Sequence, residues 1–290
     1  MPNDQTASAR AAPITIPSMT QTVLLALDTS TEFCSVALLS AAADKAGHAR
    51  AEPRTWLRHE QTGAVSSTRL LPAIRELFDE AGLTLADCNA IAFGSGPGSF
   101  TGLRTATGVA QGLAFGLALP VVPVSTLLVC AESARRRDVS ATRVLAALDA
   151  RMDEIYWADY AWDHVQGEWR TVQAASLDTP ERLVLPDEPF TLAGNAAAAF
   201  GARLPAVAAA RTVDCEALPH ALPLAYAALR AFRAGRTVPA DQAAPEYVRN
   251  KVAQTTAERS AEKAEKAGKA AKDVQAATLA HDAQPGEGRQ

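Results

Sequence analysis

The feature that most constrains the fold is a strand–turn–strand unit that occurs twice in the sequence. The first unit covers residues 24–39 and the second covers residues 145–160, and the tripeptide Ala-Leu-Asp ends at Asp28 in one and at Asp149 in the other. Each unit predicts a β-hairpin whose first strand is apolar on both faces, as in the middle of a sheet. An Asp at the start of a turn accepts hydrogen bonds from the N–H groups that follow it. The repeat predicts two lobes of similar architecture; the alternative is a chance similarity of two strands that end in Asp.

Composition limits the kinds of protein that this chain can be. The 290 residues include 28 Lys and Arg and 32 Asp and Glu, giving a formal net charge of −4, and 48% of them are hydrophobic. These values are typical of a soluble globular protein and argue against one that holds nucleic acid through a broad basic surface. They do not exclude nucleic acid as the substrate of a larger complex.

The sequence predicts neither a metal site nor a membrane segment. Its four cysteines form no C-x-x-C pair, and its five histidines form no H-x-x-x-H or H-E-x-x-H motif. The longest apolar stretch, residues 108–131, is interrupted by prolines and polar residues and does not have the pattern of a membrane span. Because no export signal precedes the first strand, we expect a cytoplasmic protein with reduced cysteines.

The two ends of the chain differ from its middle. Residues 1–22 are rich in Ala, Pro, Ser and Thr, and residues 253–290 are rich in Ala, Lys and Glu with almost no large apolar side chain. Such segments cannot bury a core, so we expect a disordered N-terminal extension and a disordered tail. The folded part is then residues 23–252, divided into a first lobe of residues 23–128 and a second lobe of residues 129–252.

The first lobe continues with alternating strands and helices. Apolar patterning predicts strands at 53–59 and 90–93 and a helix at 64–81, which Gly82 ends. Pro72 is expected either to kink this helix or to mark its first turn.

A glycine-rich loop, residues 94–104, follows the strand at 90–93 and has the sequence Gly-Ser-Gly-Pro-Gly-Ser-Phe-Thr-Gly-Leu-Arg. Ser99 is expected to cap the helix that begins after it. Free N–H groups at a helix start can bind an anion, but the glycine spacing is not that of a phosphate-binding P-loop. The alternative is a turn that needs glycine for its shape only.

The helix predicted at 100–119 carries Gly108, Gly112 and Gly116 on one face. Each glycine inside a helix costs about 1 kcal/mol relative to alanine. Three of them indicate that another backbone approaches this face closely. That backbone belongs either to the chain's own sheet or to another subunit.

Four segments together resemble the bacterial TsaB (YeaZ) family: residues 23–39, 94–127, 143–160 and 244–250. The resemblance implies the α/β fold of the actin, Hsp70 and sugar-kinase ATPases, with two lobes that each contain a β-sheet and helices. It also implies a subunit of the complex that makes N6-threonylcarbamoyladenosine (t6A) at position 37 of tRNAs reading codons that begin with A.

In that complex the catalytic subunit is a TsaD-like paralogue, and a TsaE-like ATPase joins the two. The family member is a non-catalytic partner that activates the paralogue, forms a homodimer when alone, meets tRNA indirectly through the complex and needs no cofactor of its own.

The residues of this chain favour a non-catalytic subunit. ATPases of this fold have glycines in both hairpin turns, where backbone N–H groups approach the phosphates. Here neither turn contains glycine, and the second carries the bulky Arg151 and Met152. The residues at these degenerate nucleotide-type loops are Asp28, Thr29, Ser30, Gly96, Gly98, Ser99 and Asp149.

Two enzymatic alternatives compete with this prediction. The catalytic paralogue carries an H-x-x-x-H metal pair, and at the matching place this chain has Thr126 and Cys130. A metallopeptidase therefore lacks its ligands. An actin-like ATPase or phosphotransferase that is active on its own remains the alternative to a scaffold.

A scaffold acts through a surface, and the helices at 64–81 and 100–119 are expected to form it. The resemblance implies that this helical face pairs with the paralogue or with a second copy. The expected contact residues are Leu70, Leu71, Ile74, Arg75, Phe78, Thr105, Val109 and Leu113. For each of them, the alternative is burial against the parent sheet. A glutamate at Ile74 or Val109 is expected to break the complex and leave the monomer folded.

The second lobe offers weaker signals. The basic run at residues 135–137 is expected to cap a helix end, with a tRNA phosphate contact as the alternative. Trp157, Trp162 and Trp169 are expected to pack in the sheet rather than stack on bases.

Overall fold

The computed structural model describes residues 21–42 and 52–249. The chain divides into two units, residues 1–248 and residues 249–290, and every element described below belongs to the first unit. The predicted disordered tail, residues 253–290, lies outside the described residues. Of the predicted extension, residues 1–22, only the last two are described, and they begin the first strand.

The first lobe is built on a five-stranded sheet in the order β3-β2-β1-β4-β5. β1 pairs antiparallel with β2 and parallel with β4, so that Leu24 lies opposite Leu39 on one side and Ala90 on the other. The strands are β1 (Gln21–Asp28), β2 (Phe33–Ala42), β3 (Arg54–Gln61), β4 (Ala90–Gly96) and β5 (Val121–Ser125). The predicted first hairpin is therefore confirmed.

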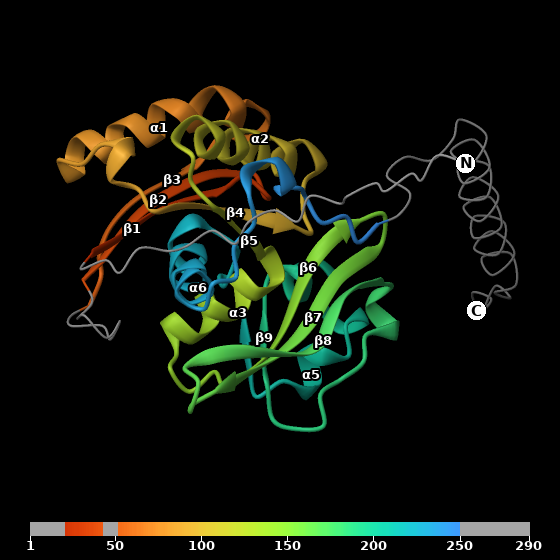
Figure 1. The fold of residues 1–290 in the computed structure, drawn as a ribbon. Coiled ribbons are helices and arrows are strands. Elements are labelled where there is room, and N and C mark those ends of the chain that lie inside the picture. Colours follow the sequence, from red (N-terminus) through yellow and green to blue (C-terminus); the bar gives the residue numbers. More distant parts are fainter. Residues whose placement is uncertain (1–20, 43–51, 250–290) are drawn as a thin grey trace, which may run out of the picture. The chain divides into compact units, whose positions relative to one another are not determined.

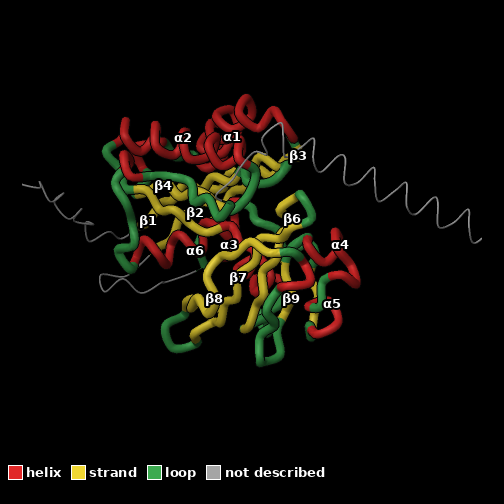
Figure 2. Tube along the Cα trace, turned by 90° about the vertical axis from the view of Figure 1, so that its right-hand side faces the viewer, coloured by secondary structure: helices red, strands yellow, loops and turns green. Residues whose placement is uncertain are grey.

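Helices cover both faces of this sheet. Figures 1 and 2 show α1 (Ser66–Ala81) and α2 (Phe100–Leu117) side by side on one face, and α6 (Ala221–Arg233) on the other. Alternate residues of β1 face the two layers: Leu25 and Leu27 pack under α1 and α2, whereas Leu24 and Ala26 pack against α6. This is why β1 is apolar at almost every position.

The second lobe repeats the design with a five-stranded sheet in the order β10-β9-β6-β7-β8. Its strands are β6 (Arg143–Arg151), β7 (Glu154–Asp163), β8 (Glu168–Asp178), β9 (Thr191–Ala193) and β10 (Thr212–Asp214). Its shorter helices are α4 (Ala196–Phe200) and α5 (Ala206–Ala209), and α3 (Thr126–Arg137) leads into it from the first lobe. The second hairpin, β6–β7, is also confirmed.

Short 3-10 turns complete the described chain. They are η1 (Gly63–Val65), η2 (Leu85–Asp87), η3 (Pro180–Arg182), η4 (Gly201–Arg203) and η5 (Ala240–Gln242). The expected end of α1 is confirmed: Gly82 has a left-handed φ of 65° and its N–H donates to the carbonyl of Asp79. Pro72 lies well inside α1, so its alternative place in the first turn is wrong.

One element crosses the predicted boundary between the lobes. α6 falls in the segment assigned to the second lobe, residues 129–252, yet it packs on the first sheet. Small side chains such as Ala225 and Ala228 are fully buried there and let the helix approach β1 closely. The first sheet needs this helix because an uncovered apolar face would expose Leu24 and Leu39 to water.

Candidate functional site

The glycine-rich loop lies directly on the β1–β2 turn. The Ser99 N–H donates to the Ser30 carbonyl at 2.8 Å, and the Thr29 hydroxyl donates to the Gly102 carbonyl at 2.6 Å. A Cβ on Gly98 would lie 2.7 Å from the Ser30 carbonyl oxygen, and one on Gly102 would overlap the Thr29 carbonyl. These glycines therefore permit close packing within the chain. This agrees with the alternative that the loop needs glycine only for the shape of its turn.

Ser99 caps α2 as expected, because its hydroxyl accepts a hydrogen bond from the Gly102 N–H at 3.4 Å. Thr126, at the start of α3, donates from its hydroxyl to the Pro97 carbonyl. The loop is thus bonded to the protein on two sides.

Asp28 is enclosed at the centre of this arrangement. Its Oδ1 accepts from the Ser30 N–H at 3.1 Å and from the Ser30 hydroxyl at 2.8 Å, which confirms the predicted turn. Its Oδ2 is buried, has no hydrogen-bond partner among the residues that the structure describes, and lies against Gly94, where a Cβ would overlap it. Burial raises the pKa of this carboxyl to about 6. Asp28 is only 1% exposed, so it does not face an open phosphate cradle.

A C-terminal segment closes the loop from a third side. We call residues 244–248 the strap. The Glu246 N–H donates to the Ser95 carbonyl at 2.7 Å, and a Cβ on Gly96 would lie 2.5 Å from the Glu246 carbonyl oxygen. Tyr247 accepts a hydrogen bond from Arg104 Nε at 3.0 Å. The sequence prediction contained no role for the strap, because nothing local in these residues indicates that they return to the first lobe.

The second hairpin turn has a different construction. Asp149 Oδ1 accepts from the Arg151 N–H at 2.8 Å, as predicted, and the Asp149 N–H donates to Asn195 Oδ1 at 2.9 Å. Arg151, Met152 and Asp153 all have left-handed φ values, of 62°, 57° and 62°. Side chains other than glycine seldom adopt this conformation, so the turn departs from the glycine-lined turn that approaches a phosphate.

Neither Thr126 nor Cys130 is placed to hold a metal. Both are fully buried, and burial raises the pKa of the Cys130 thiol. Among residues 21–42 and 52–249, no group of three His, Cys, Asp or Glu side chains could hold a metal ion. Within the same ranges, no helix has the length and apolar character needed to cross a membrane.

The predicted contact residues divide into buried and exposed sets. Leu70, Ile74 and Phe78 are 0%, 4% and 5% exposed and belong to the core beneath α1, so for them the alternative of burial against the parent sheet holds. Leu71 is 54% exposed, and Arg75 is also exposed. Ile74 is therefore not on an exposed edge, and a glutamate there would disrupt the monomer.

On α2, the remaining predicted residues are half-buried. These are Thr105, Val109 and Leu113. Val109 and Leu113 pack against the core under the two helices, so a glutamate at Val109 also perturbs the fold. They lie beside the exposed face rather than at its centre.

The glycine face of α2 is open. Gly108, Gly112 and Gly116 are exposed, and a Cβ on any of them would meet no described atom within 4 Å. Of the two alternatives, approach by the chain's own sheet is therefore wrong. Phe115 beside the glycines is 78% exposed. We call Gly108, Gly112, Gly116 and Phe115 the glycine ridge.

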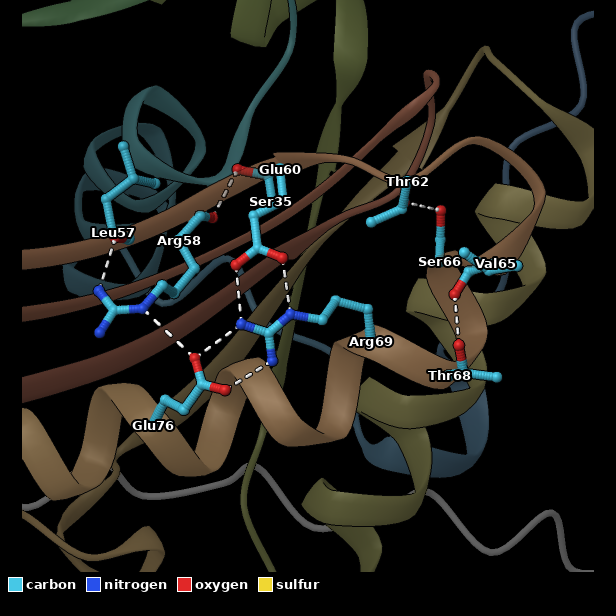
Figure 3. Close-up of polar contacts among 10 residues, drawn as sticks. All are labelled: Ser35, Leu57, Arg58, Glu60, Thr62, Val65, Ser66, Thr68, Arg69 and Glu76. Atoms are coloured by element: carbon cyan, nitrogen blue, oxygen red, sulfur yellow. Dashed lines mark hydrogen bonds and ion pairs between the residues drawn. The ribbon is translucent and has the colours of Figure 1, made fainter.

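An ion-pair network fastens α1 to the edge strand β3. Figure 3 shows Arg69 between two carboxylates: Glu60 on β3, at 2.6 and 2.7 Å, and Glu76 on α1, at 2.7 Å. Arg58 on β3 pairs with Glu80 at 2.6 Å. Hydrogen bonds from Arg69 lower the pKa of both Glu60 and Glu76. This network ties α1 to the edge of the first sheet.

The basic run and the tryptophans of the second lobe pack together. Arg135 lies 4.1 Å from the ring centre of Trp162, and Arg137 pairs with Asp214 at 2.9 Å. Trp169 donates from its indole N–H to the buried Glu132 at 2.8 Å. Packing in the sheet is therefore the role that these contacts support.

The chain is similar to a known family and to several single proteins. Residues 60–284 match the family model described as TsaD, tRNA N6-adenosine threonylcarbamoyltransferase. The tRNA threonylcarbamoyladenosine biosynthesis protein TsaB of Escherichia coli (strain K12) is 39% identical over 237 residues, which cover 79% of this chain and 96% of that protein. The TsaB protein of Haemophilus influenzae is 36% identical over 242 residues, which cover 81% and 96%.

A solved structure agrees with these matches. The crystal structure of a Pseudomonas aeruginosa protein with similarity to peptidase YeaZ is 43% identical, covers 79% of this chain and 100% of its own, and has a TM-score of 0.70. The family model carries the name of a transferase, whereas the two relatives that the chain matches over 96% of their length are TsaB proteins. Because the chain covers the TsaB proteins almost completely, we assign it to their family and not to that of the transferase. The chain therefore belongs to the TsaB (YeaZ) family and has its actin-like fold of two lobes.

Proposed function

We propose that this chain is the non-catalytic scaffold subunit of the complex that transfers a threonylcarbamoyl group to N6 of adenosine 37 in tRNAs reading codons that begin with A. It binds a TsaD-like catalytic paralogue and activates it, a TsaE-like ATPase joins them, and tRNA is met through the complex. When the paralogue is absent, the chain pairs with a second copy. The names of the relatives in E. coli and H. influenzae support the pathway.

The closed hairpin turn supports a non-catalytic role. A nucleotide phosphate would need the turn's backbone N–H groups and the space above them. Here the Ser30 N–H is bonded to Asp28, and the loop residue Gly98 occupies the space against Ser30. Opening this turn would break the hydrogen bonds between Ser99 and Ser30 and between Thr29 and Gly102.

The glycine ridge is the observation that carries the proposal. Its three glycines cost helix stability, about 1 kcal/mol each, and nothing described in this chain packs on them in return. A second helix lying across the ridge could come unusually close, because no Cβ separates the two backbones. We therefore place the partner face on the glycine ridge together with Leu71 and Arg75 of α1, and no longer on Leu70, Ile74 or Phe78.

Reconstitution of tRNA modification tests the proposal. The TsaD-family and TsaE-family proteins of the same organism are supplied with ATP and a threonylcarbamoyl adenylate donor and assayed on tRNA with the wild-type chain, without it, and with Gly112→Leu. We expect modification to require the chain and to fall sharply with Gly112→Leu. The matched control is Ala198→Leu, at an exposed position of α4 in the second lobe. Full modification without the chain, or equal activity of both variants, would contradict the scaffold role.

The ATPase alternative has its own measurement. The fold and the unpartnered Oδ2 of Asp28 are the features that favour it. Hydrolysis of ATP by the isolated chain, abolished by Asp28→Ala, would support an enzyme. We expect no hydrolysis above that of the Asp28→Ala variant.

A further inference from the structure

The strap brings an aromatic side chain to the N-terminal end of α2. There Tyr247 lies 5.6 Å from the ring centre of Phe100, and the Arg104 guanidinium lies 3.9 Å above the Phe100 ring. Arg104 also donates from Nε to the Tyr247 hydroxyl at 3.0 Å. Phe100 is 37% exposed and Tyr247 is 41% exposed. We call Phe100, Arg104 and Tyr247 the strap cluster.

The strap cluster holds a guanidinium in a fixed orientation. Stacking on Phe100 sets the plane of the group, and the bond from Nε to Tyr247 sets its rotation in that plane. The two terminal nitrogens of Arg104 make no hydrogen bond to any residue in the described ranges, and the side chain is exposed. A planar guanidinium with both terminal nitrogens available binds a carboxylate through two parallel hydrogen bonds.

Charge on the same face points to an acidic partner. Arg58 and Arg69 of this lobe are neutralised by carboxylates of β3 and α1. Arg75 of α1 and Arg104 of α2 form no ion pair with a residue that the structure describes. Arg104 lies one helical turn before Gly108, so this cation adjoins the glycine ridge.

The surroundings favour a protein carboxylate over an RNA phosphate. RNA binding relies on a field of basic residues, whereas the chain's formal net charge is −4 and Arg58 and Arg69 of this lobe are already paired with carboxylates. An exposed set of Tyr, Phe and Arg is also the composition of residues that dominate protein interfaces.

We propose that the strap cluster is part of the partner face, and that Arg104, positioned by Tyr247, receives an Asp or Glu side chain from the helix that lies on the glycine ridge. This inference rests on the proposed function in one respect: the TsaD-family protein is taken as the source of that helix. Tyr247 is a positioning residue, because it acts through Arg104.

Calorimetric titration of the full-length chain with its own TsaD-family protein, over a series of salt concentrations, tests the inference. We expect Arg104→Glu to weaken binding roughly 100-fold, as the loss of a buried charge pair does, and Tyr247→Phe to weaken it about 5-fold. The double variant should bind no more weakly than Arg104→Glu alone. Arg104→Lys, which keeps the charge but loses the planar group, should bind less well than wild type. Thermal unfolding of each variant alone checks the fold.

Two further arms separate the explanations. Arg170→Glu, at an exposed position of β8, is the matched charge-reversal control and should bind like wild type. An Asp or Glu to Arg exchange on the partner should restore binding to Arg104→Glu, which a merely structural role of Arg104 would not allow.

The outcomes distinguish this inference from the proposed function. If the wild-type chain does not bind the TsaD-family protein, the proposed function fails and the inference with it. If wild type binds and Gly112→Leu prevents binding, but Arg104→Glu and Tyr247→Phe bind normally with an unchanged salt dependence, only the inference fails. If Arg104→Glu weakens binding of isolated tRNA and leaves the protein partner unaffected, the cluster is an RNA contact and the inference is overturned.

Discussion

Replacing the ridge glycines by alanine should make the monomer more stable and the complex weaker. Gly108 and Gly112 lie in the interior of α2 with nothing described within 4 Å of an added Cβ. Each Gly→Ala change at such a position is worth about 1 kcal/mol in helix propensity. The double variant should therefore gain about 2 kcal/mol, which raises Tm by roughly 4–8 °C in a domain of this size.

The effect on the complex should have the opposite sign. If a partner helix lies on the ridge, two methyl groups enter a close contact, and overpacking of this kind costs about 2 kcal/mol, or roughly 30-fold in affinity. Calorimetry of the isolated chain measures the first effect, and titration with the TsaD-family protein measures the second.

The control for the ridge variant is Ala198→Gly, which should lower the stability of α4 and leave binding unchanged. A double variant that is more stable and binds as tightly as wild type would show that no backbone approaches the ridge. A variant that is less stable would show that the glycines are needed inside the monomer. Either result would refute the reasoning.

Three other predictions concern ionisable side chains. Burial raises the pKa of Asp28 from 3.8 to about 6. Between these two pH values the folded protein keeps the Asp28 proton that the unfolded chain has lost. The stability that this proton contributes is therefore lost as pH rises from 4 to 6. The stability of Asp28→Asn relative to wild type should therefore grow by about 2 kcal/mol between pH 4 and pH 7 in urea titrations; a constant difference would contradict a raised pKa. His220, whose pKa burial lowers to about 4, should destabilise the wild type as pH falls from 6.5 to 4, by about 3 kcal/mol, and His220→Gln should remove that loss. If the two proteins lose stability equally on acidification, His220 is not the responsible group. Arg69→Ala should cost about 1 kcal/mol at low salt and less at high salt, since its ion pairs are partly exposed; a loss that salt does not change would indicate packing instead of charge.

The local parts of the fold could be predicted because short-range chemistry determines them. The Asp28 and Asp149 turns, the Ser99 cap and the Gly82 helix end each depend on a hydrogen bond or a backbone angle within a few residues. Apolar periodicity likewise predicted α1 within two residues of its observed start, at Ser66. These features need no knowledge of distant contacts.

The surface could not be assigned from the same pattern. Leu70, Leu71 and Ile74 are all apolar, and only the direction of α1 relative to the sheet decides that Leu71 points outward. Tyr247 lies far along the sequence from Arg104, and the return of the strap depends on the whole path of the chain through the second lobe and α6. Contacts between distant segments follow from topology, which periodicity does not contain.

One stretch of chain uses glycine for two opposite purposes. In the loop, Gly98 and Gly102 let the start of α2 pack against the β1–β2 turn. The contacts made there within the chain offset the cost of having glycine at these positions. Farther along the same helix, Gly108, Gly112 and Gly116 weaken α2, and no described residue packs on them. A helix weakened by about 3 kcal/mol at exposed positions gains no contact from the described residues, whereas alanine would fit there without strain. We therefore infer that the glycines of the ridge serve a contact with another protein, while the contacts of Gly98 and Gly102 fix the start of the helix that carries them.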